Sequence, residues 1–244
     1  MKICIVGNSH VGSLQRAWTA WPEAERPAVT LTAFAARHRL MDQADVIEGR
    51  LVAGTDALRE SFRFTSGGAD EADLAAYDAI LLYGLFVPAY RGNGARCSRA
   101  CQTAAFEDHF DPRLGIGAAR KIRQGTRAPV LIGHDPLMCD PEAEAADPAP
   151  GRPGDAYAVG IRLANGLYFR RRGLEILEQP AATRVGPGGH QTRAALSKGS
   201  RRLAIGDKLD DREHGDGDQR HMNEDFGRAY LDMLFARLGA AARG

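Results

Sequence analysis

Serine, histidine and aspartate residues stand near the two ends of the sequence in an arrangement that suits nucleophilic catalysis. Ser9 directly follows a short apolar run and the turn-forming pair Gly7-Asn8. Near the other end, Asp218 precedes His221 by three residues, so one helical turn or a tight loop brings the carboxylate to the imidazole. A serine nucleophile needs a base for its proton and a partner that orients the base. Ser9, His221 and Asp218 are therefore candidates for nucleophile, base and orienting carboxylate.

Ser9 also has a purely structural interpretation. Val11, Leu14 and Trp18 recur at helical spacing, which predicts a helix that begins near Ser9. A serine hydroxyl at that place can cap the helix by accepting a hydrogen bond from a backbone N–H of the first turn. The strand, turn and serine alone favour this cap, and only the Asp-x-x-His unit at the far end favours catalysis.

The composition is that of an ordinary globular protein. The chain has 244 residues, of which 44% are hydrophobic and 26% are charged, and its formal net charge is +1. This balance gives no reason to expect binding to nucleic acid or to an anionic membrane. No apolar stretch approaches the roughly 18 residues of a membrane span, and the N-terminal apolar run is too short for a signal peptide. We therefore expect a cytoplasmic protein, whose oligomeric state the sequence leaves open.

Short apolar runs alternate with helical patterns, which predicts an α/β fold with a mostly parallel central sheet and helices on both faces. Strands are expected at 3–6, 29–34, 78–84, 129–133 and 174–177, and helices from about residue 9, at 97–110, 114–124 and 155–172, and at 226–238. We expect a single domain over residues 1–244. It includes an insertion or edge hairpin around 37–70, with short strands at 46–52 and 61–65, and a long loop around 136–153.

The sequence contains no recognisable metal or cofactor motif. Cys97 and Cys101 stand four residues apart, but with Cys139 or His109 they match no zinc-ligand spacing. The segment at 7–13 follows a strand and opens a helix, as a phosphate-binding loop does, but it has no lysine to reach a phosphate. We therefore expect no metal ion and no organic cofactor.

The two end motifs resemble those of the SGNH (GDSL-like) hydrolase superfamily. The Gly-Asn-Ser-His run at 7–10 looks like the block that holds the family's nucleophile, and the Asp-Gln-Arg-His run at 218–221 looks like its Asp-x-x-His block. The resemblance implies a three-layer α/β/α flavodoxin-like fold and a triad of Ser9, His221 and Asp218. It covers the two ends of the chain by motif, and the rest only by the order of elements.

The sequence departs from the family pattern in the first block and in the middle block. Asn8 and His10 replace the family's aspartate and leucine, and Gly-Asp-Ser-His-type blocks look like those of SGNH domains that esterify or de-esterify carbohydrates. The expected Gly-x-Asn-Asp block begins at Gly84 but has no asparagine there, and Asn93 in the same loop is a substitute. The resemblance therefore implies an oxyanion hole built from backbone N–H groups of Ser9 and Gly84, with Asn93 as a further donor.

The residues around the nucleophile give a first outline of the pocket. Asn8 and His10 flank Ser9, and His134 stands at the carboxyl end of an expected central strand. Ligands bind outside these strand ends in open α/β sheets. We therefore expect Asn8, His10 and His134 to line the pocket.

The resemblance implies a serine esterase, and it points to an O-acylated carbohydrate as the substrate. An O-acyltransferase is an alternative, because the two reactions share an acyl-enzyme and differ only in whether water or a sugar hydroxyl attacks it. A phosphate- or nucleotide-binding transferase and a catalytically inactive binding module with the same fold are further alternatives.

Overall fold

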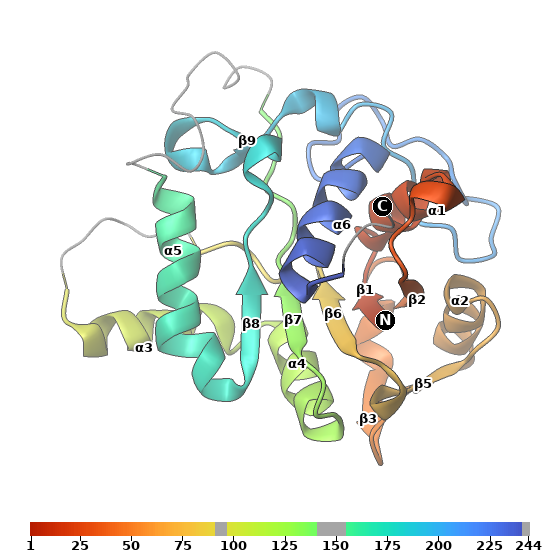
Figure 1. Ribbon diagram of the computed structural model, residues 1–244, viewed down its shortest axis with the longest axis horizontal. Helices are drawn as coiled ribbons and strands as arrows, with labels where there is room; N and C mark the ends of the chain where they lie inside the picture. The colour runs from red at the N-terminus through yellow and green to blue at the C-terminus, as the bar shows by residue number, and fades with distance from the viewer. Residues whose placement is uncertain (91–96, 141–154, 241–244) are drawn as a thin grey trace.

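A five-stranded parallel sheet forms the centre of the protein (Figure 1). The computed structural model describes residues 1–90, 97–140 and 155–240. The strand order is β2-β1-β6-β7-β8, and each neighbouring pair is parallel. The strands are β1 (Lys2–Gly7), β2 (Thr30–Ala35), β6 (Ala79–Tyr83), β7 (Val130–Gly133) and β8 (Leu174–Leu177). The predicted α/β class and parallel sheet are confirmed.

Helices cover both faces of this sheet, so helix, sheet and helix form three layers. In β1, Ile3 and Ile5 point to one face, where α1 (Val11–Ala20) and α6 (Glu224–Leu238) pack. Cys4 and Val6 point to the other face. That face is covered by α2 (Asp56–Ser66), α3 (Arg99–Phe110), α4 (Leu114–Gly125) and α5 (Ala156–Ala164). In Figure 1, α6 lies in front of the sheet and α4 behind it.

The helices α1 and α6 pack unusually closely. A Cβ atom on Gly227 of α6 would overlap the backbone carbonyl of Ser13 in α1, so only glycine fits there. Further along, the rings of Trp18 and Trp21 lie 5.7 and 5.8 Å from that of Phe235. Two helices that are distant in sequence are thereby joined along their length.

A small antiparallel sheet lies beside the main one. It consists of β3 (Ala44–Ile47), β4 (Arg50–Ala53) and β5 (Glu71–Asp73), and α2 connects β4 to β5. The predicted strand at 61–65 is wrong, because this segment belongs to α2. Thr55 caps that helix by accepting from the Leu58 N–H, and Gly67 ends it with φ of +81°.

The helix predicted at 155–172 is less regular than expected. After α5 the chain continues as the π-helical segment η5 (Asn165–Phe169) and the 3₁₀ segment η6 (Arg170–Arg172). Asn165 exchanges two hydrogen bonds with the backbone of Ile176 in β8, at 2.8 and 2.9 Å, which ties the irregular turn to the sheet. Most of the loop expected around 136–153 lies outside the described residues.

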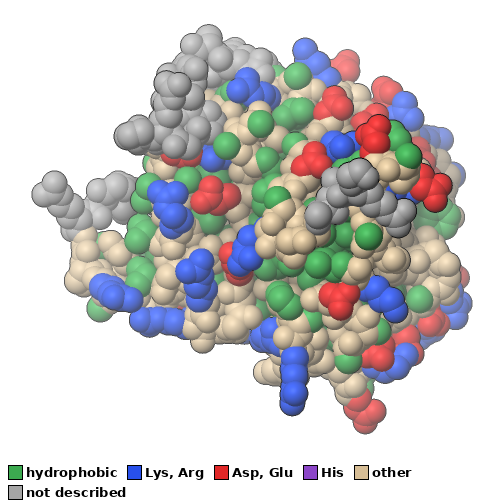
Figure 2. All heavy atoms as spheres, in the orientation of Figure 1, with side chains coloured by type: hydrophobic (Ala, Val, Ile, Leu, Met, Phe, Trp, Pro, Cys, Tyr) green, Lys and Arg blue, Asp and Glu red, His purple; other side chains and the backbone are tan. Residues whose placement is uncertain are grey.

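The connections contain short elements. They are η1 (Glu23–Glu25), η2 (Leu40–Gln43), η3 (Leu74–Ala76), η7 (Ala181–Thr183), β9 (Arg184–Val185), η8 (Pro187–Gly189), β10 (Gln191–Thr192) and η9 (Ala194–Leu196). None of the helices in the described ranges combines the length and apolarity that crossing a bilayer requires. Acidic and basic side chains are interspersed over most of the face shown in Figure 2.

Candidate active site

Ser9 lies in the turn between β1 and α1, at the carboxyl edge of the sheet. Along the chain, β1 is followed by β2 on one side, whereas β6 pairs with its other side, so the strand order reverses at β1. Ligands of open α/β sheets bind at such a reversal. The helix-cap interpretation of Ser9 is wrong, because His10 occupies the N-cap position of α1 and no side chain caps the helix.

The structure brings Ser9, His221 and Asp218 into one chain of hydrogen bonds. Ser9 Oγ lies 2.9 Å from His221 Nε2, and His221 Nδ1 lies 2.8 Å from Asp218 Oδ2. An ionised carboxylate can only accept, so the proton of the neutral ring is on Nδ1. Nε2 then carries the lone pair and accepts from the Ser9 hydroxyl. This is the protonation state that a general base needs.

Asp218 has two separate tasks, one for each carboxylate oxygen. Oδ2 receives the His221 ring, while Oδ1 accepts from the backbone N–H groups of Arg220 and His221, at 2.8 and 2.9 Å. Burial acts to raise the pKa of Asp218, but the hydrogen bonds from His221 and Arg220 outweigh it and lower the pKa to about 2. The carboxylate is therefore ionised at neutral pH and also shapes the turn that presents His221.

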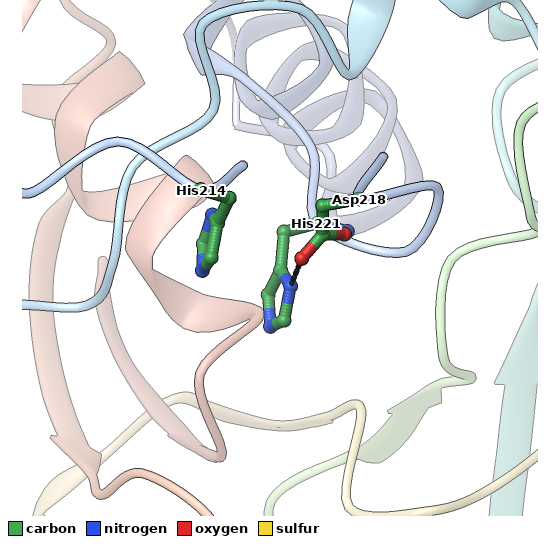
Figure 3. Close-up of side chains that lie close together, drawn as sticks. All are labelled: His214, Asp218 and His221. Carbon is green, nitrogen blue, oxygen red and sulfur yellow. Dashed lines mark hydrogen bonds and ion pairs between the residues drawn. The ribbon is translucent and has the colours of Figure 1, made fainter. Parts of the chain in front are cut away.

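His214 stacks on the face of the His221 ring (Figure 3). The ring centroids are 3.9 Å apart and the planes differ by 11°. Burial, and next the neighbouring His221, lower the pKa of His214 to about 4, so this ring is neutral at physiological pH. No motif or periodic pattern in the sequence indicated this contact.

The His10 ring is a second neighbour of the His221 ring. The two ring centroids are 5.0 Å apart and the ring planes are tilted by 31°. Burial, and next His221, lower the pKa of His10 to about 3. His10 Nε2 is 4.0 Å from Asp135 Oδ1, and burial raises the pKa of Asp135 to about 7. Between those two pKa values both groups are uncharged, so the contact is not an ion pair in mildly acidic solution.

A cavity of about 370 Å³ opens beside Ser9, His221 and Asp218. Most of the residues that line it are polar or charged, and Phe86 and Leu203 are the apolar members. The lining residues are Asn8, Ser9, His10, Arg37, His38, Phe86, Arg202, Leu203, His214, Asp218, Arg220 and His221. A larger cavity of about 580 Å³ runs along α1 and β2, but its lining includes none of these three residues. Asn8 and His10 thus line the cavity that the sequence led us to expect.

His134 lies elsewhere, which corrects the expectation that it lines the pocket. Its Nε2 is 2.6 Å from the hydroxyl of Tyr157 in α5, and its Nδ1 is 2.5 Å from the carbonyl of Asp135. The ring is buried, and burial lowers its pKa to about 4. The side chain points toward the α5 layer, so His134 joins that helix to the sheet.

Arg37 fixes the wall of the cavity and was not indicated by any sequence motif. This buried side chain donates to the Leu203 carbonyl at 2.7 Å, to Asp207 at 2.8 Å and to Asp210 at 2.6 Å. These bonds anchor residues 203–210 to the turn after β2. The chain continues from that anchor toward His214.

The structure does not support all three groups that were expected to donate to the oxyanion. The Gly84 N–H is already used, because it donates to the Gly133 carbonyl at 2.9 Å, which corrects the assignment of Gly84 as a donor. Gly84 instead provides space: its φ is +74°, and a Cβ there would overlap Asn8 Oδ1. Asn93 lies outside the described residues. The Ser9 N–H has no acceptor within the described part of the chain.

The side chain of Asn8 offers a second donor. Its Oδ1 accepts from the His10 N–H at 3.2 Å, which sets the orientation of the amide group. The residue is 4% exposed and lines the cavity. Its Nδ2 has no hydrogen-bond acceptor among residues 1–90, 97–140 and 155–240. Asn8 Nδ2 is thus a candidate donor to a group bound in the cavity.

A metal ion would have to compete with these contacts. The donor atoms of His214, Asp218 and His221 lie within 4.8 Å of one another. However, both ring nitrogens of His221 are engaged, and nitrogen lone pairs lie in the ring plane, so the nearly parallel rings do not aim at one point. Coordination would require at least one ring to rotate.

Comparison with models of protein families, with curated proteins and with solved structures finds no match for this chain. The functional assignment therefore rests on the geometry and chemistry of the site.

Proposed function

We propose that the protein is a serine hydrolase of the SGNH type that cleaves a carboxylic ester. The observation that carries this proposal is the hydrogen-bonded chain from Ser9 Oγ through His221 to Asp218, with lengths of 2.9 and 2.8 Å. Each atom has the role that nucleophilic catalysis requires. The residues also lie where the strand order reverses, beside a cavity that can hold a substrate.

The reaction follows from this arrangement. Ser9 Oγ attacks the ester carbonyl while His221 Nε2 takes the hydroxyl proton. Asp218 stays ionised and stabilises the imidazolium that forms. His221 then gives the proton to the leaving alcohol, which leaves the acyl group on Ser9. A water molecule, deprotonated by the same Nε2, attacks this ester and releases the acid.

The oxyanion of the tetrahedral intermediate needs preorganised donors. We assign the Ser9 N–H and the Asn8 Nδ2 to this role. The Ser9 N–H has no acceptor among the described residues. The Asn8 amide lines the same cavity and is oriented by the His10 N–H. Asn8 would thus replace the asparagine that the middle block of the chain lacks.

The topology supports membership in the SGNH group. Numbered along the chain, the five parallel strands have the order 2-1-3-4-5, which is that of flavodoxin-like sheets. The Asp-x-x-His segment directly precedes α6, the last helix of the described ranges, and Ser9 follows the first strand. Both placements agree with the motif resemblance.

The cavity favours a short acyl group on a polar alcohol. A volume of about 370 Å³ suits a small ligand. Most of the side chains that line it are polar or charged, and they offer hydrogen bonds to the hydroxyl groups of an alcohol. An O-acetylated carbohydrate has this chemistry.

A substrate panel with three variants tests the proposal. Hydrolysis of p-nitrophenyl esters from acetyl to octanoyl and of O-acetylated sugars would be measured for the wild type, Ser9→Ala and His221→Ala. Ser66→Ala, in α2 and outside the cavity lining, is the matched control for the loss of a serine. We expect short esters to be cleaved, Ser9 to react with a fluorophosphonate, and only the two site variants to be inactive. Full activity in Ser9→Ala would refute the proposed function.

A further inference from the structure

Three imidazole rings from separate segments of the chain meet in the site. His221 has His10 as one ring neighbour, at 5.0 Å and 31°, and His214 as the other, at 3.9 Å and 11°. Figure 3 shows the flat faces of His214 and His221 turned toward each other, while Asp218 meets the edge of the His221 ring. The nearly parallel pair is therefore a face contact, distinct from the hydrogen bonds at the ring edge.

The hydrogen bonds alone do not hold His221 throughout the proposed reaction. The bond from Ser9 Oγ to Nε2 exists only while Ser9 carries its proton. Once Ser9 is acylated, that donor is gone, and the bond from Nδ1 to Asp218 is the remaining edge contact among those described. A ring held at one nitrogen can tilt about that bond. The face contact with His214 does not depend on the state of Ser9.

His214 is itself firmly supported. Its N–H donates to the Ser200 carbonyl at 2.9 Å, and its Nδ1 lies 3.3 Å from Ser200 Oγ. Arg201 and Glu213 form an antiparallel bridge, and the Arg202 N–H donates to the Arg212 carbonyl at 2.9 Å. The segments at 200–202 and 212–214 are thus paired like two short strands. This pairing and the two contacts with Ser200 hold the His214 ring in place beside His221.

The contact gains strength at the moment of proton transfer. A neutral aromatic face attracts a cation, and His221 becomes a cation in the transition state. His214 stays neutral at physiological pH, since burial holds its pKa at about 4. An interaction that is stronger in the transition state than in the ground state accelerates the reaction.

We propose that His214 is a positioning residue, which holds the plane of the His221 ring by stacking on its face and stabilises the imidazolium form. This inference rests on the triad function proposed above. It assigns His214 no contact with the reacting atoms.

Replacement of the ring by alanine or phenylalanine separates stacking from other roles of His214. His214→Ala removes the face, whereas His214→Phe keeps a flat ring but loses the bond to Ser200 Oγ. We expect kcat for a short ester to fall by about tenfold or more in His214→Ala, equivalent to about 1.4 kcal/mol, with KM within about twofold. His214→Phe should recover most of kcat. His109→Ala, in α3 on the opposite face of the sheet, controls for the loss of an imidazole elsewhere.

A spectroscopic measurement makes the test independent of turnover. The Nδ1–H proton of His221, bound to Asp218, should give a low-field NMR resonance in the wild type and in His214→Phe. In His214→Ala it should broaden, because the ring is free to tilt. Unfolding temperatures recorded alongside show whether each variant folds. If His214→Ala does not fold, the kcat and the resonance of His214→Phe, compared with those of the wild type, test the inference.

The outcomes for this inference and for the proposed function are distinct. If Ser9→Ala is inactive but His214→Ala keeps the wild-type kcat and resonance, the stacking role is wrong and the triad stands. If a folded His214→Phe loses as much kcat as His214→Ala, the aromatic face is not what matters, and the inference is again overturned. If Ser9→Ala is active, the triad function itself fails.

Discussion

The Ser9 hydroxyl lies 2.9 Å from Nε2 of His221, although 212 residues separate them in the chain. The two helices that follow them hold this contact. Ser9 comes just before α1 and His221 just before α6, and these helices touch where Gly227 meets the Ser13 carbonyl. Asn223, at the N-cap of α6, also donates to the carbonyls of Ala195 and Lys198, at 3.0 and 3.1 Å.

Gly227→Ala should lower activity more than the addition of one methyl group would suggest. The new Cβ would overlap the Ser13 carbonyl, so α6 must move away from α1. Overpacking of this kind destabilises by about 1–3 kcal/mol, and a shift of α6 also draws His221 away from Ser9. We expect a lower unfolding temperature together with a large fall in kcat/KM. Gly117→Ala, in α4, is the matched control, because a Cβ at this position would have no atom within 4 Å. Equal activity and equal unfolding temperature of the two variants would contradict the role of the helix contact.

Asp218→Asn should nearly abolish turnover while leaving the fold intact. An asparagine can donate to Nδ1 of His221, which would move the ring proton to Nε2 and remove the base for Ser9. The corresponding change in a known serine-protease triad lowers kcat by about 10⁴, and we expect a fall of about 10³ or more with KM little changed. Asp216→Asn, exposed in the same loop, should behave as the wild type. Activity in Asp218→Asn close to that of the control would rule out the assigned role.

Asn8→Asp should slow the reaction by removing an oxyanion donor. The change replaces Nδ2 with a carboxylate oxygen, which repels the developing charge, while the other oxygen still accepts from the His10 N–H. Loss of one such donor lowers kcat by about 10²–10³. Steady-state kinetics with a short ester measures the effect. The variant also restores the aspartate of the family's first block, so an unchanged kcat would show that the oxyanion is held by other groups.

Asp135→Asn should remove a pH-dependent loss of stability. Burial raises the pKa of Asp135 from 3.8 to about 7, so the folded protein binds this proton more tightly than the unfolded chain. The stability that the protonated carboxyl contributes is complete below about pH 4 and is lost as the pH rises toward about 7. Asparagine cannot ionise, and it keeps an oxygen for the Phe86 N–H.

The free energy of unfolding in urea provides the measurement for Asp135. Between about pH 4 and about pH 8, the wild type should lose about 1–3 kcal/mol more stability than Asp135→Asn. Asp108→Asn, exposed on α3, should follow the wild type. Parallel pH curves for wild type and Asp135→Asn would mean that the Asp135 carboxyl has the same pKa in the folded and unfolded chain.

The central strands could be predicted because their apolar runs are continuous and end in turn residues. In β6 all five residues are buried, which is the pattern of a parallel strand covered on both faces. The segment at 61–65 was misassigned because Phe62 and Phe64 alternate with polar neighbours. Only Phe62 is buried, however, while Phe64 is 51% exposed. Leu58 and Phe62, four residues apart, form the buried face of a helix.

In the candidate site, only the contacts between residues of one local motif could be predicted from the sequence. Asp218 and His221 belong to one turn, so their contact follows from their spacing. The stacking of His214 depends instead on two loop segments pairing with each other, and the sequence carries no periodic signal for it. The use of the Gly84 N–H depends on the neighbouring strand β7, whose register no motif specifies.

The separation of Ser9 and His221 has a consequence during synthesis. The ribosome makes Ser9 212 residues before His221, so the proposed nucleophile is synthesised long before the proposed base. The proposed catalysis requires that α6 has packed against α1, because His221 lies just before α6 and Ser9 just before α1. From the proposed function we expect a nascent chain, or one truncated before His221, to be inert, so that turnover would report on completed folding.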